Sequence, residues 1–202
     1  MCYVIILFEA TKKEGVKIKT VYILLTRTGT LPSRLIHSFV RGKYTHTSLA
    51  IRPRTDEFYS FARRTLRNPL NAGFIIENIH TFVFSKYPDS DCAVYSLEVS
   101  DDAYERLENT INKFVSNPRR YNYNFLGLLP AKLGIEFNRR YHYTCSQFVA
   151  TLLHSSGAAA LPKPPSLMMP CDFLKIPNIT PVYEGKLKNC KIRPVNQALR
   201  SI

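Results

Sequence analysis

The chain has 202 residues, of which 45% are hydrophobic, and it carries a formal net charge of +13. No Pro-, Gly- or Ser-rich linker divides it, so we expect one domain over residues 1–202 with a substantial core. The five cysteines include no C-x-x-C spacing, which excludes a familiar zinc site or disulfide framework, and we expect neither metal nor cofactor. The apolar run at residues 2–8 is too short to span a bilayer and has no basic leader, so we expect a cytoplasmic protein.

The first half of the chain predicts short strands around one helix. The strands are expected at residues 3–8, 19–26, 47–51 and 57–62. The helix is expected over residues 30–41, because its apolar residues share one face and Gly42 follows its end. The last two strands form a predicted hairpin across Pro53. A further apolar strand is expected after the loop that holds His80.

The second half predicts helices between two strands. The strands are expected at residues 93–99 and 180–183. A helix begins at Ser100 with two acidic residues in its first turn, a second piece covers residues 124–133, and a short turn covers residues 171–174. Together with the first half, this order predicts an α+β fold with a mainly antiparallel sheet.

A further predicted helix begins at the segment YTCSQFV and places a thiol in its first turn. Thr144 and Gln147 have the spacing of a capping box, and Gly157 is a natural helix stop. Unpaired N–H groups and the helix dipole favour an anion at such a position, so Cys145 is a candidate thiolate nucleophile. Ser146 is expected to point away from both the cap and the thiol.

A cysteine nucleophile needs a base, and His46 is the best candidate among the five histidines. It opens the β-prone run HTSLAI just after Gly42 and Lys43, so its ring would project from the start of a strand. The histidine precedes Cys145 by about a hundred residues, and partners of this kind meet in space.

These segments resemble the circularly permuted branch of the NlpC/P60 papain-like superfamily, which includes YiiX-like and lecithin:retinol acyltransferase-like proteins. The resemblance is carried by His46 in YTHTSLAI, by EFYSFARR, and by Cys145 in YTCSQFVATLL, and it runs from about Thr20 to Glu184. Other pieces, such as YNYNFLGLL, are similar to uncharacterised bacterial members. The resemblance implies a permuted papain-like fold with the cysteine helix packed against the sheet. It also implies a cysteine hydrolase that acts on an amide or peptide bond through a thioester.

A third polar group normally orients such a histidine. If residues 51 and 57 pair in the hairpin, His46 stands opposite Ala62 and Ser60 lies diagonally on the same face, whereas Glu57 faces the other way. The resemblance implies a carboxylate, histidine or other polar side chain on this next strand, and Ser60 departs from the strongest version of that pattern. From the register we place Ser60 first as the third catalytic residue and keep Glu57 as the alternative.

The basic charge predicts an anionic substrate or surface. Nine Lys and Arg residues lie between Arg27 and Arg67, against only two acidic residues. Arg63, Arg64 and Arg67 are candidates to bind a carboxylate, phosphate or lipid headgroup of a peptide, amide or acyl substrate.

Two other functions remain open. A lipid acyltransferase or phospholipase, acting at a membrane surface, would need an exposed apolar element near Cys145. The only source for one is the stretch NFLGLLPAKLGI (residues 124–135), which we expect to be core or pocket wall. A non-catalytic nucleic-acid-binding protein would fit the charge, but the sequence has no recognisable nucleic-acid motif. Asp172 is expected to be structural, at the start of its short helix.

Overall fold

The computed structural model describes residues 18–27, 42–52, 57–65, 68, 70–79 and 82–190. Within these ranges the protein is α+β, with one 8-stranded mixed sheet in the order β7-β6-β4-β3-β2-β1-β5-β8. The strands are β1 (Ile18–Arg27), β2 (His46–Ala50), β3 (Glu57–Arg63), β4 (Ala72–Asn78), β5 (Asp91–Ser100), β6 (Asn122–Tyr123), β7 (His142–Tyr143) and β8 (Thr180–Lys186). Neighbouring strands are antiparallel except β6 and β7.

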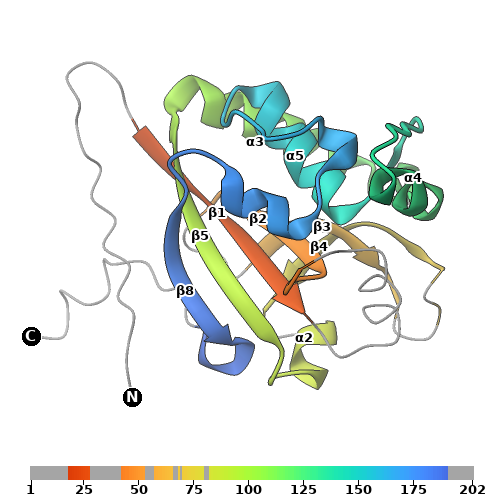
Figure 1. The fold of residues 1–202 in the computed structure, drawn as a ribbon, viewed down its shortest axis with the longest axis horizontal. Helices are drawn as coiled ribbons and strands as arrows, with labels where there is room; N and C mark the ends of the chain where they lie inside the picture. The colour runs from red at the N-terminus through yellow and green to blue at the C-terminus, as the bar shows by residue number, and fades with distance from the viewer. Residues whose placement is uncertain are drawn as a thin grey trace, which may run out of the picture.

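Helices α3 and α5 lie side by side over the sheet, whereas α2 lies apart from them beside β4 (Figure 1). The helices are α2 (Phe82–Lys86), α3 (Asp101–Ser116), α4 (Leu128–Lys132) and α5 (Cys145–Ser156). The 3₁₀ turns are η1 (Pro118–Arg120), η2 (Phe125–Gly127), η3 (Pro165–Leu167), η4 (Pro170–Lys175) and η5 (Leu187–Asn189). None of the helices in the described ranges is long and apolar enough to cross a bilayer.

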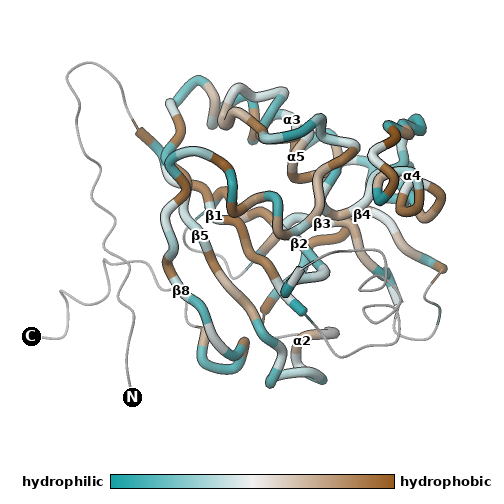
Figure 2. Tube along the Cα trace, viewed as in Figure 1, coloured by the Kyte–Doolittle hydropathy of each residue, from teal (hydrophilic) through white to brown (hydrophobic). Residues whose placement is uncertain are grey.

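Alternation along the strands gives the sheet two buried faces. On β1, Val21 and Ile23 belong to the core beneath α3 and α5, whereas Tyr22 and Leu24 belong to a second cluster on the opposite face. The central strands are accordingly the most hydrophobic part of the trace (Figure 2). Phe148 of α5 seats that helix on the first core, with its ring centroid 5.0 Å from that of Phe61 on β3. Burying such a side chain contributes about 1.5–3 kcal/mol.

The β2–β3 hairpin has the predicted register. Leu49 pairs with Tyr59, which is the alignment in which residues 51 and 57 pair, and it places Ser48 opposite Ser60. β4 then pairs along the other edge of β3, with Glu77 opposite Phe58. Residues 48, 60 and 77 therefore share one face of the sheet.

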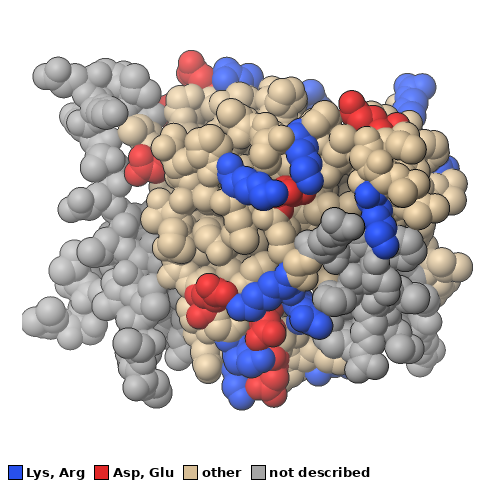
Figure 3. All heavy atoms as spheres, viewed as in Figure 1, with Lys and Arg blue, Asp and Glu red and all other residues tan. Residues whose placement is uncertain are grey.

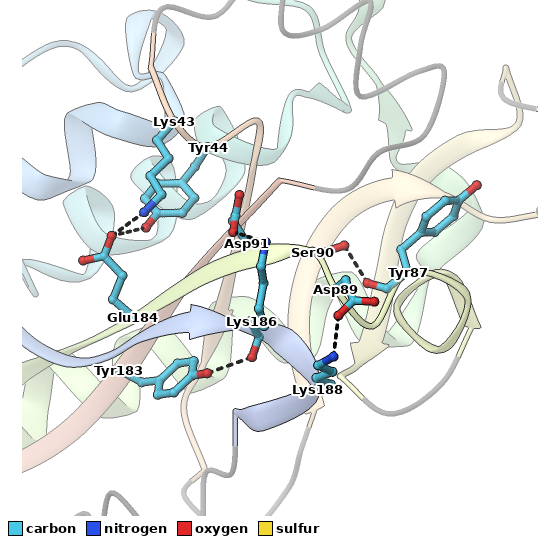
Figure 4. Close-up of polar contacts among 10 residues, drawn as sticks. All are labelled: Lys43, Tyr44, Tyr87, Asp89, Ser90, Asp91, Tyr183, Glu184, Lys186 and Lys188. Atoms are coloured by element: carbon cyan, nitrogen blue, oxygen red, sulfur yellow. Dashed lines mark hydrogen bonds and ion pairs between the residues drawn. The ribbon is translucent and has the colours of Figure 1, made fainter. Parts of the chain in front are cut away.

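The turn before β2 is held by polar contacts to β8 (Figure 4). Lys43 Nζ lies 2.6 Å from Glu184 Oε1, and the Tyr44 hydroxyl donates to the same oxygen at 3.1 Å. Gly42 begins this turn at φ 137°, and a Cβ there would lie 2.2 Å from Cys171 Sγ. Only glycine fits this backbone conformation so close to Cys171. These contacts fix the position from which β2, and therefore His46, starts.

Most predicted elements that fall in the described ranges are present. The strands predicted at residues 19–26, 93–99 and 180–183 lie within β1, β5 and β8, and the turn predicted at residues 171–174 lies within η4. Helix α3 begins where expected, because the Ser100 hydroxyl accepts from the Ala103 N–H. The strand and helix predicted at residues 3–8 and 30–41 lie outside the described residues.

Three predictions are corrected. The segment after His80 forms the short helix α2 rather than a strand, since an apolar run this short has no periodicity that separates the two. β4 was not predicted. The stretch at residues 124–135 is not core throughout: Leu128 packs against the core, but Leu126, Leu129 and Leu133 are more than half exposed. Its helical part is also broken into η2 and α4.

Candidate catalytic site

Cys145 is the first residue of α5, and the predicted capping box is present. The Gln147 N–H donates to Thr144 Oγ1 at 3.1 Å, and the Thr144 N–H donates to Gln147 Oε1 at 3.4 Å. Gly157 ends the helix at φ 73°. Cys145 is 4% exposed, so its thiol lies at a buried helix start among N–H groups that have no helical partner.

The start of β2 brings His46 to this thiol. The His46 ring and the Cys145 side chain form a hydrogen bond, and the Thr47 backbone N–H also donates to the sulfur. The sequence predicted that Ser146 points away from the thiol, and this prediction is wrong. Ser146 is buried, with its hydroxyl bonded to the Cys145 sulfur and 3.4 Å from Thr47 Oγ1, because the first turn of α5 packs directly on β2.

The other side of the His46 ring contacts a carboxylate that the sequence did not predict. Glu77 on β4 places Oε1 and Oε2 at 2.8 and 2.9 Å from His46 Nε2. Ser48 donates to Glu77 Oε2 at 2.5 Å and thereby holds the carboxylate in place. Because Glu77 occupies Nε2, Nδ1 is the ring nitrogen left for the thiol.

Of the two residues predicted as the third catalytic member, one is near the ring. Ser60 Oγ lies 3.4 Å from His46 Nε2, but it donates to the Thr47 carbonyl at 2.7 Å. Ser60 therefore lies beside the contact between Glu77 and His46, and its own hydrogen bond goes to the backbone. Glu57 is exposed at the first residue of β3 and pairs with Asn78, so it faces away from the ring, as the register predicted.

The contacts stabilise opposite charges on the histidine and the cysteine. Burial disfavours the charged ring, but the Glu77 charge and the Cys145 hydrogen bond outweigh it and raise the pKa of His46 to about 10. Burial also disfavours a thiolate, yet the hydrogen bond and charge of His46, with the Thr47 N–H, lower the pKa of Cys145 below its ordinary value. Both shifts favour the thiolate–imidazolium pair more than the same two groups would favour it in water.

A tyrosine completes the surroundings of the sulfur. The hydroxyl of Tyr123 on β6 bonds to the Cys145 side chain and accepts from the Cys145 backbone N–H. Burial, and then the Cys145 charge, raise the pKa of Tyr123 well above its ordinary value, so this hydroxyl keeps its proton. It is placed to donate to an oxyanion that forms at Cys145.

Of the predicted basic residues, Arg64 is engaged by backbone carbonyls. Arg64 donates to the carbonyls of Pro118 and Tyr121 at 2.8 and 2.5 Å, which ties the end of β3 to β6. Arg63 ends β3 opposite Ala72, and Arg67 lies outside the described residues. Within the ranges that the structure describes, no three His, Cys, Asp or Glu side chains are grouped as metal ligands.

Sequence reasoning missed Glu77 because it missed the strand that carries it. The signal was the run Phe74-Ile75-Ile76, bounded by Gly73 and Asn78, which is typical of a short strand. An acidic residue at the end of that run would then have been a candidate partner for His46.

Comparison of the chain with protein-family models, with curated proteins and with solved structures found no match.

Proposed function

We propose that the protein is a cysteine hydrolase that cleaves an amide or peptide bond through a thioester on Cys145. The observation that carries this proposal is the continuous series of contacts from the Glu77 carboxylate through the His46 ring to the Cys145 sulfur. A buried thiol that is merely structural needs neither a histidine nor a carboxylate behind it. A nucleophile needs both, to lose its proton and to keep the base oriented.

In the acylation step, the Cys145 sulfur attacks the carbonyl carbon and the carbonyl oxygen becomes an oxyanion. The Tyr123 hydroxyl donates to that oxygen. His46 then donates its Nδ1 proton to the leaving nitrogen, the C–N bond breaks, and an amine departs. The thioester and a neutral His46 remain.

In the deacylation step, neutral His46 takes a proton from water and the resulting hydroxide attacks the thioester carbon. The same hydroxyl stabilises the second oxyanion. The C–S bond then breaks, which releases a carboxylic acid and restores the thiolate beside the imidazolium. Glu77 keeps its contact with His46 Nε2 and holds the ring in one orientation.

The order of elements supports membership of the permuted NlpC/P60 papain-like group. The histidine strand β2 precedes the cysteine helix α5, and α5 packs on β2 and β3. The carboxylate of Glu77 is a type of residue expected of that group, but it lies on β4, one strand beyond the β3 position that the resemblance implied.

A second candidate function is the transfer or hydrolysis of a lipid acyl group. It requires an exposed apolar element near Cys145. Leu126, Leu129 and Leu133 are exposed on the segment that begins at Phe125, whose ring lies 4.7 Å from that of Tyr123. The chemistry at Cys145 is the same, with an alcohol rather than an amine as the leaving group.

The proposal is tested by trapping the acyl-enzyme. The full-length chain is mixed with activated p-nitrophenyl esters, one of a short N-acyl amino acid and one of a long fatty acid, and quenched in acid. Mass spectrometry should find the acyl group on Cys145, and preference between the esters separates the two candidates. Cys171→Ala should be acylated like the wild type. Acylation elsewhere, or none with either ester, would overturn the proposal.

A further inference from the structure

The large apolar side chains exposed on this protein are concentrated in one segment. Six of the eleven in the described part of the chain lie between residues 125 and 137, and each is between 38% and 65% exposed. They are Phe125, Leu126, Leu129, Leu133, Ile135 and Phe137. Scattered exposed leucines need no explanation, but a cluster of this size on η2, α4 and the following turn does. We call residues 125–137 the apolar lobe.

The apolar lobe is held by hydrogen bonds at both ends. Asn124 is fully buried; its side chain accepts from the Gly127 N–H at 3.2 Å and donates to the Phe137 carbonyl at 3.3 Å. Within the lobe, the Ile135 N–H donates to the Pro130 carbonyl at 2.9 Å. The fold therefore presents these side chains to the outside in a defined arrangement.

The apolar lobe adjoins the catalytic site at two points. The Phe125 ring lies 4.7 Å, centroid to centroid, from the ring of Tyr123, whose hydroxyl bonds to Cys145. At the other end, Gln147 of the α5 cap donates to Asn138 Oδ1 at 2.9 Å. A surface seated on the lobe would lie next to the nucleophile.

The flanks of the apolar lobe are basic. Residues 119–140 contain five basic residues and one acidic residue, Glu136. The basic ones are Arg119, Arg120, Lys132, Arg139 and Arg140. In the space-filling view, the α4 end is mostly uncharged, with Lys and Arg side chains and an acidic group at its margin (Figure 3), and α4 is among the hydrophobic parts of the trace (Figure 2). An apolar surface with a basic rim is complementary to the acyl chains and phosphate groups of an anionic membrane.

We propose that the apolar lobe docks the protein onto an anionic lipid bilayer and so presents Cys145 to the headgroup and ester region of that bilayer. The consequence for the substrate, an acyl lipid, rests on the acyl-transfer function proposed above. The docking does not, and it is measured in a variant without the nucleophile.

The experiment uses full-length Cys145→Ala and vesicles of phosphatidylcholine with phosphatidylglycerol in co-sedimentation. The chain should sediment with the vesicles, less so as salt rises, and less with phosphatidylcholine alone. The triple variant Leu126→Ser, Leu129→Ser, Leu133→Ser should bind vesicles at least about tenfold more weakly, since it loses three apolar side chains that would insert into the bilayer. The matched control is Leu70→Ser, which changes a leucine that is 76% exposed outside the lobe.

Equal binding by the lobe variant and the control would overturn the proposal. A second outcome would also overturn it: the wild type is a dimer, the lobe variant is a monomer, and both bind vesicles equally. The apolar lobe would then contact a second copy of the chain. Acylation of Cys145 by soluble esters is measured in parallel with an intact nucleophile. Lost docking with normal acylation refutes only the docking, whereas docking without acylation refutes only the enzymatic proposal.

Discussion

At the scale of single residues, the site depends on a buried histidine between two acidic groups. An imidazolium removed from water is costly unless it is paired, and His46 has Glu77 on one nitrogen and the Cys145 thiol as its other partner. The same contacts that raise the pKa of His46 lower that of Cys145. One geometry therefore both activates the nucleophile and charges the acid that protonates the leaving group.

The first prediction concerns Glu77. In Glu77→Gln the ring loses its negative partner, so the pKa of His46 should fall and less thiolate should form at neutral pH. We expect turnover of an activated ester to fall by about 10²–10⁴-fold. The matched control is Glu57→Gln, an exposed glutamate on the adjacent strand, which should keep full activity. If both variants lose activity equally, Glu77 does not orient the base.

How much of this site was predictable differs from residue to residue. Cys145 and His46 could be predicted because a capping box and a β-prone run are local patterns. Glu77 could not be derived in the same way, because its role depends on the pairing of β3 with β4, which brings it to a ring 31 residues earlier in the chain. Ser60 was correctly expected to lie near the ring, since the hairpin register is also local.

At the scale of elements, the N-terminus of α5 combines a structural cap with the reactive group. We predict that Thr144→Ala destabilises the protein by about 0.5–2 kcal/mol, because the first turn loses its cap. The pKa of Cys145 should also rise, since a frayed turn directs fewer N–H groups at the sulfur. Urea unfolding and thiolate absorbance measure the two effects.

Two serines of α5 serve as comparisons for that prediction. Ser146→Ala should raise the pKa of Cys145 while leaving the cap intact, because the Ser146 hydroxyl bonds to the sulfur. Ser155→Ala, at an exposed position late in the helix, should change neither property. Identical titration curves for all the variants would show that the helix start does not activate the cysteine.

A second element, η4, supports the turn that leads to β2. The Asp172 carboxylate accepts from Lys163 at 2.8 Å, from Lys175 at 3.2 Å and from the Met169 N–H at 3.1 Å. Burial opposes its charge, but these donors prevail and lower the pKa of Asp172 below its ordinary value of 3.8. The expected structural role of this residue follows from these contacts.

We predict that Asp172→Asn lowers the free energy of unfolding by about 1–3 kcal/mol at neutral pH and leaves turnover nearly unchanged. Because the folded pKa is lowered, the contribution of Asp172 is present above pH 3.8 and is lost as the pH falls through the folded value. The difference in the free energy of unfolding between variant and wild type, measured by urea denaturation, should therefore become smaller at acid pH. A large loss of turnover with unchanged stability would instead assign Asp172 to the catalytic site.

At the scale of the whole molecule, the α+β class and the mainly antiparallel sheet were predictable from the alternation of short apolar runs and amphipathic helices. Strands β6 and β7, each of two residues, were not, because they exist only through pairing with distant chain segments. The apolar lobe was wrongly expected to be interior. The hydrophobicity of a segment indicates that its side chains will be buried. It does not indicate whether they are buried in the core of the protein or against a binding partner.

The free energy of unfolding of the whole chain should depend on pH through the protonation of His46 and Cys145. Folding raises the pKa of His46 from 6.5 to about 10 and lowers that of Cys145 from 9.0. Above pH 9.0 the unfolded pair holds no proton, whereas folded His46 keeps one, so the stability that the pair contributes falls as the pH rises through the His46 value. The lowered pKa of Cys145 acts at the other end: the stability from its thiolate is lost as the pH falls through the folded Cys145 value.

Urea denaturation gives the free energy of unfolding at each pH for the wild type and for a Cys145→Ala, His46→Ala double variant. The quantity of interest is the difference between these two free energies. We predict that this difference falls as the pH rises from 9.0 through the His46 value of about 10. A difference that stays level over that range would contradict the pairing, because folded His46 would then hold no proton that the unfolded ring lacks.

Ultraviolet titration of the thiolate tests most directly whether Cys145 is activated by His46. Thiolate absorbance is followed against pH for the wild type, with Cys145→Ser as the blank, and for His46→Ala. We predict that Cys145 titrates below its ordinary value of 9.0 in the wild type. Its pKa should rise without His46, because only the Thr47 N–H and the Ser146 hydroxyl then oppose the effect of burial. A Cys145 that titrates at or above 9.0 in the wild type, or equally in both proteins, would contradict the account.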